Sequence, residues 1–572
     1  MIVANLDRVS VVYTSEPVFR DLAWEIEERT VVGLVGPNGC GKSTLLRLVA
    51  GEIKSETGYN VRRPGLTVGY LAQEPQLASG RSVWEESLAA DSALAEVERD
   101  LIQTEAQLED PIVLKDERRL SRTLELQARL LEKYVAMGGP GYEGRVRSAL
   151  YGLGFTAADL ALPVDVLSGG QKKLVGLARL MVTQPDLLLL DEPDNHLDLD
   201  GKATLEQFIR AYPGTVILVS HDRYLLDLVV DEIAELEDGR LTRYPGSYSE
   251  YAFEKQVRLA RQQQVYQAQQ KEISRLEHAA KRLLTWGRVY DNPKFTRRGF
   301  NIMNRLEKMD KVERPILERR RMALELPGWR GSSKVLEIMN LCKAFPAETA
   351  EAEDVILLAG VDLALRHGER VGVLGPNGSG KSLLFRLILG AAERQEGAAE
   401  RPTDGQITVG PSVQIGYYAQ QHENLDYDET LVDTVRQAAV ISEEGAVAFL
   451  RRFLFTYEQS RSRVGNLSGG ERSRLQLALL MLSGANFLLL DEPTNNLDIA
   501  SAEVLESALV DFEGTVLVIS HDRYFLDQLV ERIVALDDGA LTEYQGGYVD
   551  YQAATGGRPV KARRSSLAIP RS

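Results

Sequence analysis

Short apolar runs alternate with longer amphipathic segments in the first and last parts of the chain. The runs "VVGLVG", "LLLLDE" and "TVILVSHD" have the length and continuous apolar character of buried strands. The segments "GKSTLLRLVAG" and "GGQKKLVGLARLMV" instead place apolar residues at helical spacing. This alternation predicts α/β domains with a largely parallel sheet, whose ligands bind at the carboxyl ends of the strands.

The α/β pattern occurs twice. Three motifs appear in both copies, as "GPNGCGKS" and "GPNGSGKS", "LSGGQ" and "LSGGE", and "VSHDRY" and "ISHDRY". A constant spacing of 300 residues separates the later motifs, up to Tyr251 and Tyr551. The repeat therefore predicts two copies of one domain, at 1–251 and 334–551.

The first copy contains an insertion. Gln73 and Gln420 lie 347 residues apart, whereas the motifs after them lie 300 apart, so the first copy has 47 additional residues. Leucines at helical spacing on both sides of Pro111 predict a two-helix arm at about 88–135. Because residues 91–133 hold 11 acidic and 7 basic side chains, we expect the arm to contact a basic protein or its own domain rather than RNA.

Residues 252–333 belong to neither copy. The stretch 252–285 contains no Gly or Pro and repeats apolar residues at helical spacing, which predicts an α-helical hairpin with a tip near 286–300. Residues 281–330 hold 14 Lys and Arg against 6 Asp and Glu, in a chain with a formal net charge of −16. Positive charge is therefore concentrated on this linker. Residues 552–572 are expected to be a short, basic, disordered tail.

Composition narrows the class of protein. The 572 residues are 44% hydrophobic and 26% charged, as in folded soluble proteins. No apolar run approaches the roughly 18–20 residues of a membrane helix and the start does not resemble a signal peptide, so we expect a cytoplasmic protein. The acidic total argues against uniform binding to nucleic acid. Cys40 and Cys342 are too few for a disulfide framework or a structural zinc site.

Each glycine-rich motif follows an apolar run and begins a helical segment, which is the context of a P-loop. Its glycines turn backbone N–H groups toward phosphates, its lysine neutralises the β and γ oxygens, and its serine can hold Mg²⁺. The candidate ATP-binding residues of the two loops are Gly36, Asn38, Gly39, Gly41, Lys42, Ser43 and Thr44, and Gly375, Asn377, Gly378, Gly380, Lys381 and Ser382.

Two carboxylates follow each "LLL" run. Asp191 and Asp491 end apolar strands, where a carboxylate needs a cation, so we assign them to Mg²⁺ together with the P-loop serines Ser43 and Ser382. Glu192 and Glu492 come next, where a carboxylate can polarise the water that attacks the γ-phosphate. We therefore assign these two glutamates as general bases.

A histidine follows the next apolar run in each copy. Either His221 or His521 alone would be read as a structural histidine. Their recurrence at a fixed distance from the Asp-Glu pair favours contact with the γ-phosphate, and we count both as catalytic candidates.

The "LSGG" motifs each precede an apolar, basic helix. A serine hydroxyl and bare N–H groups at a helix N-terminus make an anion site, although such a serine alone is more often a helix cap. The candidates are Ser168, Gly169, Gly170 and Gln171, and Ser468, Gly469, Gly470 and Glu471.

These motifs occur in one order in both copies: P-loop, glutamine, LSGGQ, DEP and SHD. The chain thus resembles a pair of ATP-binding cassettes of the ABC superfamily. In that family two cassettes sandwich two ATP molecules, each held by the P-loop of one cassette and the signature serine of the other. The resemblance implies that Lys42 shares a site with Ser468, and Lys381 with Ser168.

The same resemblance implies further contacts. Gln73 and Gln420 would join the two metal sites. An aromatic shortly before each P-loop would stack on adenine, which matches Tyr13 and, more loosely, Phe345. A position in the core is the alternative for both aromatics.

Several features together resemble the ABC-F family over nearly the full chain. They are the two cassettes on one chain, "EPTNNLD", "SHDRYFLD", the "YxGxYxxY" ending and the charged helical linker. That family consists of soluble ATPases that act on ribosomes, some housekeeping and some protecting against antibiotics. The resemblance implies a monomer whose ATP-closed form binds the ribosome, through ribosomal RNA and the peptidyl-site transfer RNA.

The linker supplies the candidate RNA contacts, because arginines can pair with phosphates and aromatics can stack on bases. The alternative is a solvated charged face whose aromatics hold the hairpin together. The candidates are Trp286, Arg288, Lys294, Arg297, Arg298 and Arg305.

The alternative functions are an ATPase subunit of an ABC transporter, a DNA-repair or chromosome-organising ATPase, and an ATP-gated binding module without hydrolysis. Retention of both glutamates favours hydrolysis over the last. Four differences between the copies predict unequal hydrolysis at the two sites: Thr44 against Leu383, Asp194 against Thr494, His196 against Asn496, and Gln171 against Glu471.

Overall fold

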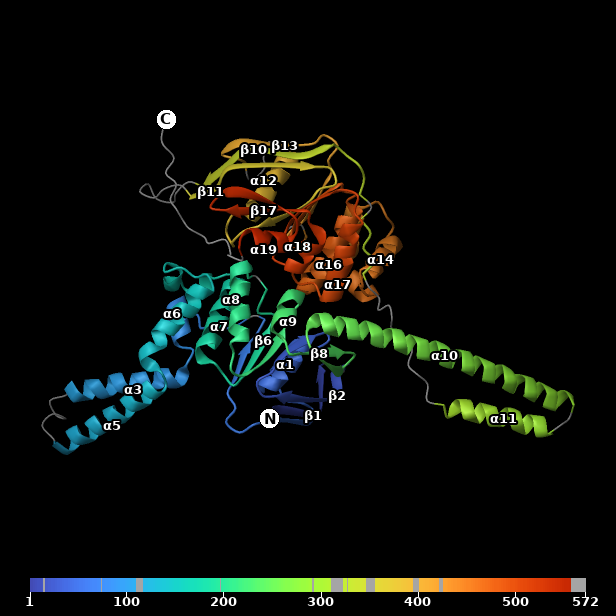
Figure 1. Cartoon of the computed structure of the whole chain (residues 1–572), viewed down its shortest axis with the longest axis horizontal. Coiled ribbons are helices and arrows are strands. Elements are labelled where there is room, and N and C mark those ends of the chain that lie inside the picture. The colour runs from blue at the N-terminus through green and yellow to red at the C-terminus, as the bar shows by residue number, and fades with distance from the viewer. Residues whose placement is uncertain are drawn as a thin grey trace. The chain divides into compact units, whose positions relative to one another are not determined.

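The computed structural model describes residues 1–556 apart from several short segments. Those segments are 14–15, 74, 110–116, 196, 291–292, 310–321, 327, 346–354, 394–400 and 421–424. The expected tail beyond 556 and the difference at His196 therefore lie outside the described residues. The chain divides into two compact units, one of Met1–Pro245 with Met322–Ser572 and one of Gly246–Arg321 (Figure 1).

Each copy of the repeat is built on a six-stranded sheet, in the order β5-β6-β7-β3-β8-β9 and β14-β15-β16-β12-β17-β18. Only the last pair in each order is antiparallel. The first sheet contains β3 (Val31–Val35), β5 (Val68–Leu71), β6 (Leu187–Asp191), β7 (Thr215–Val219), β8 (Glu232–Glu237) and β9 (Arg240–Pro245). The second contains β12 (Arg370–Leu374), β14 (Ile415–Tyr418), β15 (Phe487–Asp491), β16 (Thr515–Ile519), β17 (Arg532–Asp537) and β18 (Ala540–Gln545).

A three-stranded antiparallel sheet covers each six-stranded sheet, in the order β2-β1-β4 or β11-β10-β13. Its strands are β1 (Ile2–Tyr13), β2 (Glu16–Glu27) and β4 (Thr57–Arg62), and β10 (Lys334–Phe345), β11 (Val355–Arg366) and β13 (Asp404–Val409). The helix after each P-loop, α1 (Lys42–Ala50) or α12 (Lys381–Glu393), packs between the two sheets through side chains such as Leu45 and Leu384, which are fully buried (Figure 1).

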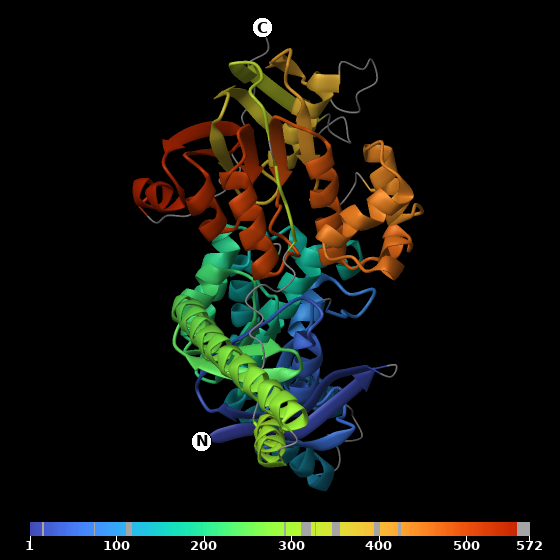
Figure 2. The ribbon, with the colours of Figure 1, turned by 90° about the vertical axis from the view of Figure 1, so that its right-hand side faces the viewer.

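Helices complete each copy. In the first they are α2 (Val83–Leu88), α6 (Tyr142–Gly152), α7 (Gly169–Thr183), α8 (Leu199–Arg210) and α9 (Arg223–Val229). In the second they are α13 (Leu431–Ala438), α14 (Glu443–Arg452), α15 (Tyr457–Ser460), α16 (Gly469–Leu482), α17 (Ile499–Val510), α18 (Arg523–Leu529) and α19 (Tyr548–Ala554). The copies meet through helices, with α9 and α18 side by side (Figure 2).

The insertion in the first copy is helical. It consists of α3 (Ser92–Glu109) and α5 (Glu117–Ala136), which pack against each other. Leu94, Val97 and Leu101 of α3 are buried. In the described part of the chain, no helix is both long and apolar enough to cross a membrane.

The second unit is a helical hairpin of α10 (Tyr248–Val289) and α11 (Pro293–Glu307). A capping box of Ser247 and Glu250 begins α10, because each satisfies a backbone N–H of the other. Two glycines allow the helices to approach closely: a Cβ on Gly287 would lie 2.9 Å from the backbone N of Thr296, and one on Gly299 would lie 2.8 Å from Leu284.

The boundaries of the hairpin differ from the expected 252–333 and from the expected tip at 286–300. Helix α10 runs to Val289, so only about three residues separate the two helices, and most tip candidates lie on helical turns. Met322, Leu324 and Leu326 are buried in the core of the second copy, and Trp329 Nε1 donates to Gly484 O at 3.0 Å. Apolar side chains at the end of the linker thus belong to the second copy.

Candidate functional site

Both P-loops close around their own lysine. Lys42 Nζ donates to the carbonyl oxygens of Gly36 and Pro37 at 2.8 and 3.0 Å, and Lys381 Nζ to those of Gly375 and Pro376 at 2.7 and 2.8 Å. Each lysine is the first residue of its helix, so its ammonium lies beside the N–H groups of the first turn. This arrangement concentrates positive potential inside the loop, as binding of a phosphate chain requires.

The first glycine of each loop is sterically required. A Cβ on Gly36 would lie 2.3 Å from the carbonyl oxygen of Leu236, and a Cβ on Gly375 would lie 2.3 Å from that of Leu536. Both glycines have φ near +155°, which side chains disfavour. The strand that carries each carbonyl therefore fixes the start of the loop.

The carboxylates assigned to Mg²⁺ and to general-base catalysis lie at the carboxyl ends of β6 and β15. Asp191 and Asp491 are the last residues of these strands and are 1% and 2% exposed. Glu192 and Glu492 follow with φ of 51° and 50°, a left-handed conformation that costs a non-glycine residue about 1–3 kcal/mol. The N–H of each glutamate donates at 2.9 Å to the last carbonyl of the neighbouring strand, which holds the conformation in place.

The two glutamates have different hydrogen bonds. Glu192 Oε2 accepts from Gln73 Nε2 at 3.1 Å and from Asn195 Nδ2 at 2.7 Å. Glu492 Oε2 accepts from the backbone N–H of His521 at 3.3 Å. In both copies Oε1 lies 3.7 Å from Nε2 of the histidine in the SHD motif, so the structure brings each glutamate and histidine together.

Burial sets the protonation of these groups. It lowers the pKa of His221 to about 3 and that of His521 well below its ordinary value, so both imidazoles are neutral. Burial raises the pKa of Glu192, and burial together with the nearby Asp491 carboxylate raises that of Glu492 to about 7. A carboxylate with a raised pKa is a stronger base toward water.

The candidate magnesium ligands of the first copy lie close together. Ser43, Gln73 and Asp191 line one cavity of about 770 Å³, and Tyr70 Oη donates to Asp191 Oδ2 at 3.4 Å. Burial raises the pKa of Asp191, opposed by its hydrogen bond from Ser43. A buried carboxylate beside a serine hydroxyl fits Mg²⁺, which takes one or two protein ligands and completes its shell with phosphate and water.

A second cavity of about 730 Å³ joins the two copies. It is lined by the P-loop and catalytic groups of the second copy, among them Lys381, Ser382, Gln420, Asp491, Glu492 and His521, and by Ser168, Gly169, Gly170 and Gln171 of the first. The pairing of one P-loop with the signature motif of the other copy is therefore present in the structure. In the described residues, Glu492 Oε1 and His521 Nδ1 are buried without a hydrogen-bond partner, which fits a site for a polar ligand.

The P-loop of the first copy also meets the second copy. Asn38 Nδ2 donates to the carbonyl oxygen of Asn496 at 3.2 Å, and a Cβ on Gly470 would lie 3.1 Å from Asn38 Nδ2. The signature serines differ in their bonds. Ser168 Oγ accepts from the N–H of Gln171, whereas Ser468 Oγ donates to Glu471 Oε2 at 2.7 Å.

Two aspartates cross between the copies, and sequence reasoning missed them. The N–H of Asn38 donates to Asp498 Oδ2 at 3.2 Å, and the N–H of Asn377 donates to Asp198 Oδ2 at 3.3 Å. Each aspartate also caps its own helix, α17 or α8. The signal was available, since both aspartates occupy equivalent positions at the 300-residue spacing.

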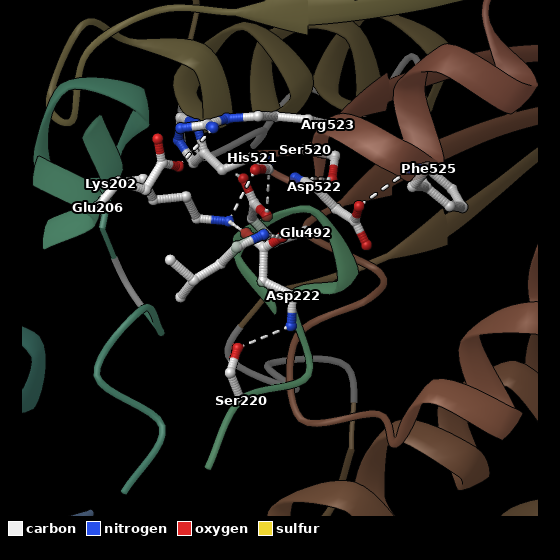
Figure 3. Close-up of polar contacts among 11 residues, drawn as sticks. Lys202, Glu206, Ser220, Asp222, Glu492, Ser520, His521, Asp522, Arg523 and Phe525 are labelled. Atoms are coloured by element: carbon white, nitrogen blue, oxygen red, sulfur yellow. Dashed lines mark hydrogen bonds and ion pairs between the residues drawn. The ribbon is translucent and has the colours of Figure 1, made fainter. Parts of the chain in front are cut away.

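Two buried ion pairs, also unpredicted, cross the same interface. Arg523 Nη1 of the second copy lies 2.5 Å from Glu206 Oε1 of the first (Figure 3), and Arg223 of the first copy binds Glu506 of the second through both Nη atoms. Arg523 is 5% exposed and Arg223 is 6% exposed. They follow the histidine of each SHD motif by two residues, so the pairs tie the catalytic loops to the opposite copy.

The proposed adenine aromatics are less well placed. The side chain of Tyr13 lies outside the described residues. Phe345 ends β10 and is 37% exposed, with Lys343 Nζ 5.0 Å from its ring centre. Thr44 and Leu383 lie in the first turn after each P-loop, and Leu383 is buried in the core of the second copy.

The hairpin carries the candidate RNA contacts. Arg288 lies near the end of α10, and Lys294, Arg297, Arg298 and Arg305 lie on α11; all five are exposed. Trp286 packs edge-on against Phe295 with ring centres 6.2 Å apart, which supports a structural role for these two aromatics. Tyr290 and Phe300 are 70% and 53% exposed, so they are available to stack on bases.

Residues 19–195 and 358–495 match the sequence model of a family described as "ABC transporter", and residues 234–326 match a second model of the same description. The chain is 35% identical to the energy-dependent translational throttle protein EttA of Haemophilus influenzae, over 95% of this chain and 93% of that one. It is 33% identical to ABC transporter F family member 5 of Arabidopsis thaliana, over 96% and 77%. A crystal structure of archaeal aABCE1, a ribosome recycling factor, in complex with ribosomal stalk protein aP1 shares the fold, with a TM-score of 0.58, 18% identity and coverage of 96% and 92%.

Reversing one buried interface charge should stop ATP hydrolysis. Arg523→Glu places two carboxylates against each other, and breaking a buried pair costs about 3–5 kcal/mol, so we expect the hydrolysis rate to fall at least about tenfold. Adding Glu206→Arg restores an ion pair and should recover most of the rate. Arg461→Glu breaks the exposed pair with Glu443, 2.6 Å apart, and should change the rate less than about twofold. Equal losses from both arginines would contradict a special role for the interface.

Proposed function

Because the chain belongs to the ABC-F family, we propose that it is a translation factor that binds the ribosome in its ATP-closed state and regulates or rescues translation. Its cassettes are those of an ATPase that converts ATP and water into ADP and phosphate. The observation that carries the ribosome proposal is the hairpin, which presents basic and aromatic side chains in a chain of net charge −16.

The hairpin suits RNA better than protein or membrane. Arg288, Arg297, Arg298 and Arg305 are exposed beside Tyr290 and Phe300, which are also exposed. Guanidinium groups pair with phosphates, and exposed aromatic rings stack on bases regardless of sequence. Thr296, Arg297, Phe300 and Asn301 line a recess of about 640 Å³ on the hairpin, large enough for an unstacked base. Ribosomal RNA and the peptidyl-site transfer RNA, in the cytoplasm, are the partners we propose.

At each site we propose that Glu192 or Glu492 orients and deprotonates the attacking water. The raised pKa of each glutamate suits this role, because it makes the carboxylate a stronger base toward water. The neutral histidine beside each glutamate can donate a hydrogen bond to the γ-phosphate without taking up the proton that the glutamate removes from water. Lys42 and Lys381 would bind the β- and γ-phosphates. Ser168 and Ser468 would hold the γ-phosphate of the opposite cassette.

Mg²⁺ would supply charge neutralisation at the phosphates when bound. We propose that Ser43, Gln73 and Asp191 hold it in one site and Ser382, Gln420 and Asp491 in the other. The geometry supports this assignment because Ser43 and Asp191 are hydrogen-bonded to each other and both line the cavity of the first copy.

Two ATP molecules would then link the cassettes, since each site takes groups from both copies. Hydrolysis removes the γ-phosphate that the signature serine holds, and the interface opens. ATP binding would thus raise the affinity of the chain for the ribosome, and hydrolysis would lower it.

Removing both bases should stop hydrolysis. Glu192→Gln with Glu492→Gln retains size and hydrogen bonding but cannot take a proton, so we expect phosphate release to fall at least about 100-fold. ATP binding, followed with a fluorescent analogue, should persist. Glu98→Gln with Glu444→Gln changes two exposed glutamates, one in each copy, and should leave the rate unchanged. Phosphate release at the original rate from the double base variant would refute the assignment.

Hydrolysis should require Mg²⁺ through Asp191 and Asp491. Asp191→Asn with Asp491→Asn removes the carboxylate that holds the ion, so the Mg²⁺ concentration giving half the maximal rate should rise at least about tenfold. The measurement is a titration of MgCl₂ at saturating ATP. Full activity in excess chelator would exclude a metal from the reaction.

Ribosome binding should depend on ATP and on the basic residues of the hairpin. With both bases replaced, ATP added to a lysate should move the protein with ribosomes in a sucrose gradient. Exchanging Arg288, Lys294, Arg297 and Arg298 for Gln should reduce the comigrating fraction at least about tenfold, because each lost phosphate contact weakens binding.

The matched control exchanges four basic residues elsewhere on α10 for Gln, namely Arg258, Arg261, Lys271 and Arg275, which are also exposed. This control variant should still comigrate with ribosomes if the ribosome contacts lie at the end of the hairpin. Protein that stays at the top of the gradient would contradict ribosome binding. Protein that instead pellets with membranes would favour the ATPase subunit of a transporter.

A further inference from the structure

Lys202 is a buried cation at the interface between the copies, and nothing equivalent exists in the repeat. It lies on α8, is 8% exposed, and corresponds to Ala502 at the 300-residue spacing. Its neighbour Asp194 corresponds to Thr494. The first copy thus has a buried lysine and a buried aspartate at the positions where the second has an alanine and a threonine.

The ammonium of Lys202 joins the SHD segments of both copies (Figure 3). Nζ lies 2.8 Å from Asp222 Oδ2, which belongs to the residue after His221, and 2.8 Å from the backbone carbonyl oxygen of His521. The first contact lies within one copy and the second crosses the interface. Although burial alone would lower it, Asp222 and Asp194 raise the pKa of Lys202 above its ordinary value, so the side chain remains charged.

A path of two hydrogen bonds connects Lys202 to the second base. Lys202 holds the carbonyl of His521, and the N–H of the same residue donates to Glu492 Oε2 at 3.3 Å. The two backbone groups flank the Cα of His521, so fixing both fixes the direction of the Cα–Cβ bond from which its imidazole extends, and Nε2 of that ring lies 3.7 Å from Glu492 Oε1. Lys202 also lines the cavity that contains Lys381 and Ser168.

The first site is built differently. Glu192 is held by two amide side chains of its own copy, Gln73 and Asn195. Position 502 is alanine, whose methyl group cannot donate to the carbonyl of His221 across the interface. The second base therefore depends on a cation from the opposite copy, and the first base on its own copy.

We propose that Lys202 is a positioning residue for hydrolysis at the second site alone: it holds His521 against Glu492 only while the copies are closed. The proposal rests on the assignment of Glu192 and Glu492 as the two bases. Through Asp222, Lys202 also makes the geometry of the second base depend on the segment that carries His221. The second base is consequently coupled to the first copy through one ammonium group.

The test gives the first copy the residues of the second. Asp194→Thr with Lys202→Ala removes one positive and one negative group together, which keeps the net charge of the buried cluster unchanged, and Thr494 and Ala502 show that the fold accepts these residues. The double change is made in the full chain with Glu192→Gln, where only the second site hydrolyses, and with Glu492→Gln, where only the first does. Steady-state phosphate release gives kcat and KM for ATP.

We expect kcat at the second site to fall at least fivefold with KM changed less than twofold, and both constants at the first site to stay within twofold. A residue that merely stabilised the interface would slow both sites equally, because both need the closed form, and that result would overturn the proposal. An unchanged second site would overturn it too. Lys202→Met, which keeps the length of the side chain without its donors, should reproduce the loss if the double variant folds poorly.

Phosphate release by the double base variant tests the assignment of Glu192 and Glu492 separately from the role of Lys202. If Glu192→Gln and Glu492→Gln together leave phosphate release intact, the assignment of the bases fails. If they abolish release and the Lys202 variants slow both sites alike, the bases stand and the role of Lys202 fails.

Discussion

The structure depends on a small number of polar contacts that pass from one cassette to the other at the P-loops. Asp198 and Asp498 each accept an N–H of the opposite P-loop and, with their other oxygen, an N–H of the helix they cap. One carboxylate therefore fixes both the start of a helix in its own cassette and the position of a phosphate-binding loop in the other. As a result, neither ATP site can have its final geometry unless the cassettes are in contact.

The buried ion pairs explain why the contact between the two cassettes can form and break. The pairs Arg523–Glu206 and Arg223–Glu506 are shielded from water in the closed arrangement. Removing such ions from water costs several kcal/mol each, which their attraction offsets only when the geometry is good. When the cassettes separate, water solvates all four groups, and this hydration compensates for the lost attraction within each pair. Such pairs set the register in which the cassettes meet while adding little net stability to the interface.

The sequence predicted what is local. A P-loop, a carboxylate pair and a helix-capping serine are each specified within a few residues. That Lys381, Gln420, Asp491 and Glu492 share one cavity with Ser168 was implied only by the resemblance to paired cassettes. The sequence did not predict contacts between residues about 300 apart, such as Arg223 with Glu506, because a spacing repeat identifies equivalent residues but not which of them touch. The ends of the helices were not predicted from the sequence either. Helical spacing located the hairpin, but α10 continues to Val289, through residues that had been assigned to the tip.

The differences between the repeats change the polar groups around the two sites. The signature serine that faces the first P-loop donates to Glu471, so a carboxylate lies beside the group meant to receive a phosphate. The corresponding serine of the second site is paired with the neutral Gln171, and Lys202 adds a positive charge to the lining of that cavity. Lys202 is paired with Asp222, and Asp194 and Asp522 line the same cavity, so its charge is balanced within the second site. The two sites therefore differ in the hydrogen-bond partner of each signature serine and in the charged groups that surround the second base, and not only in the residues of their P-loops.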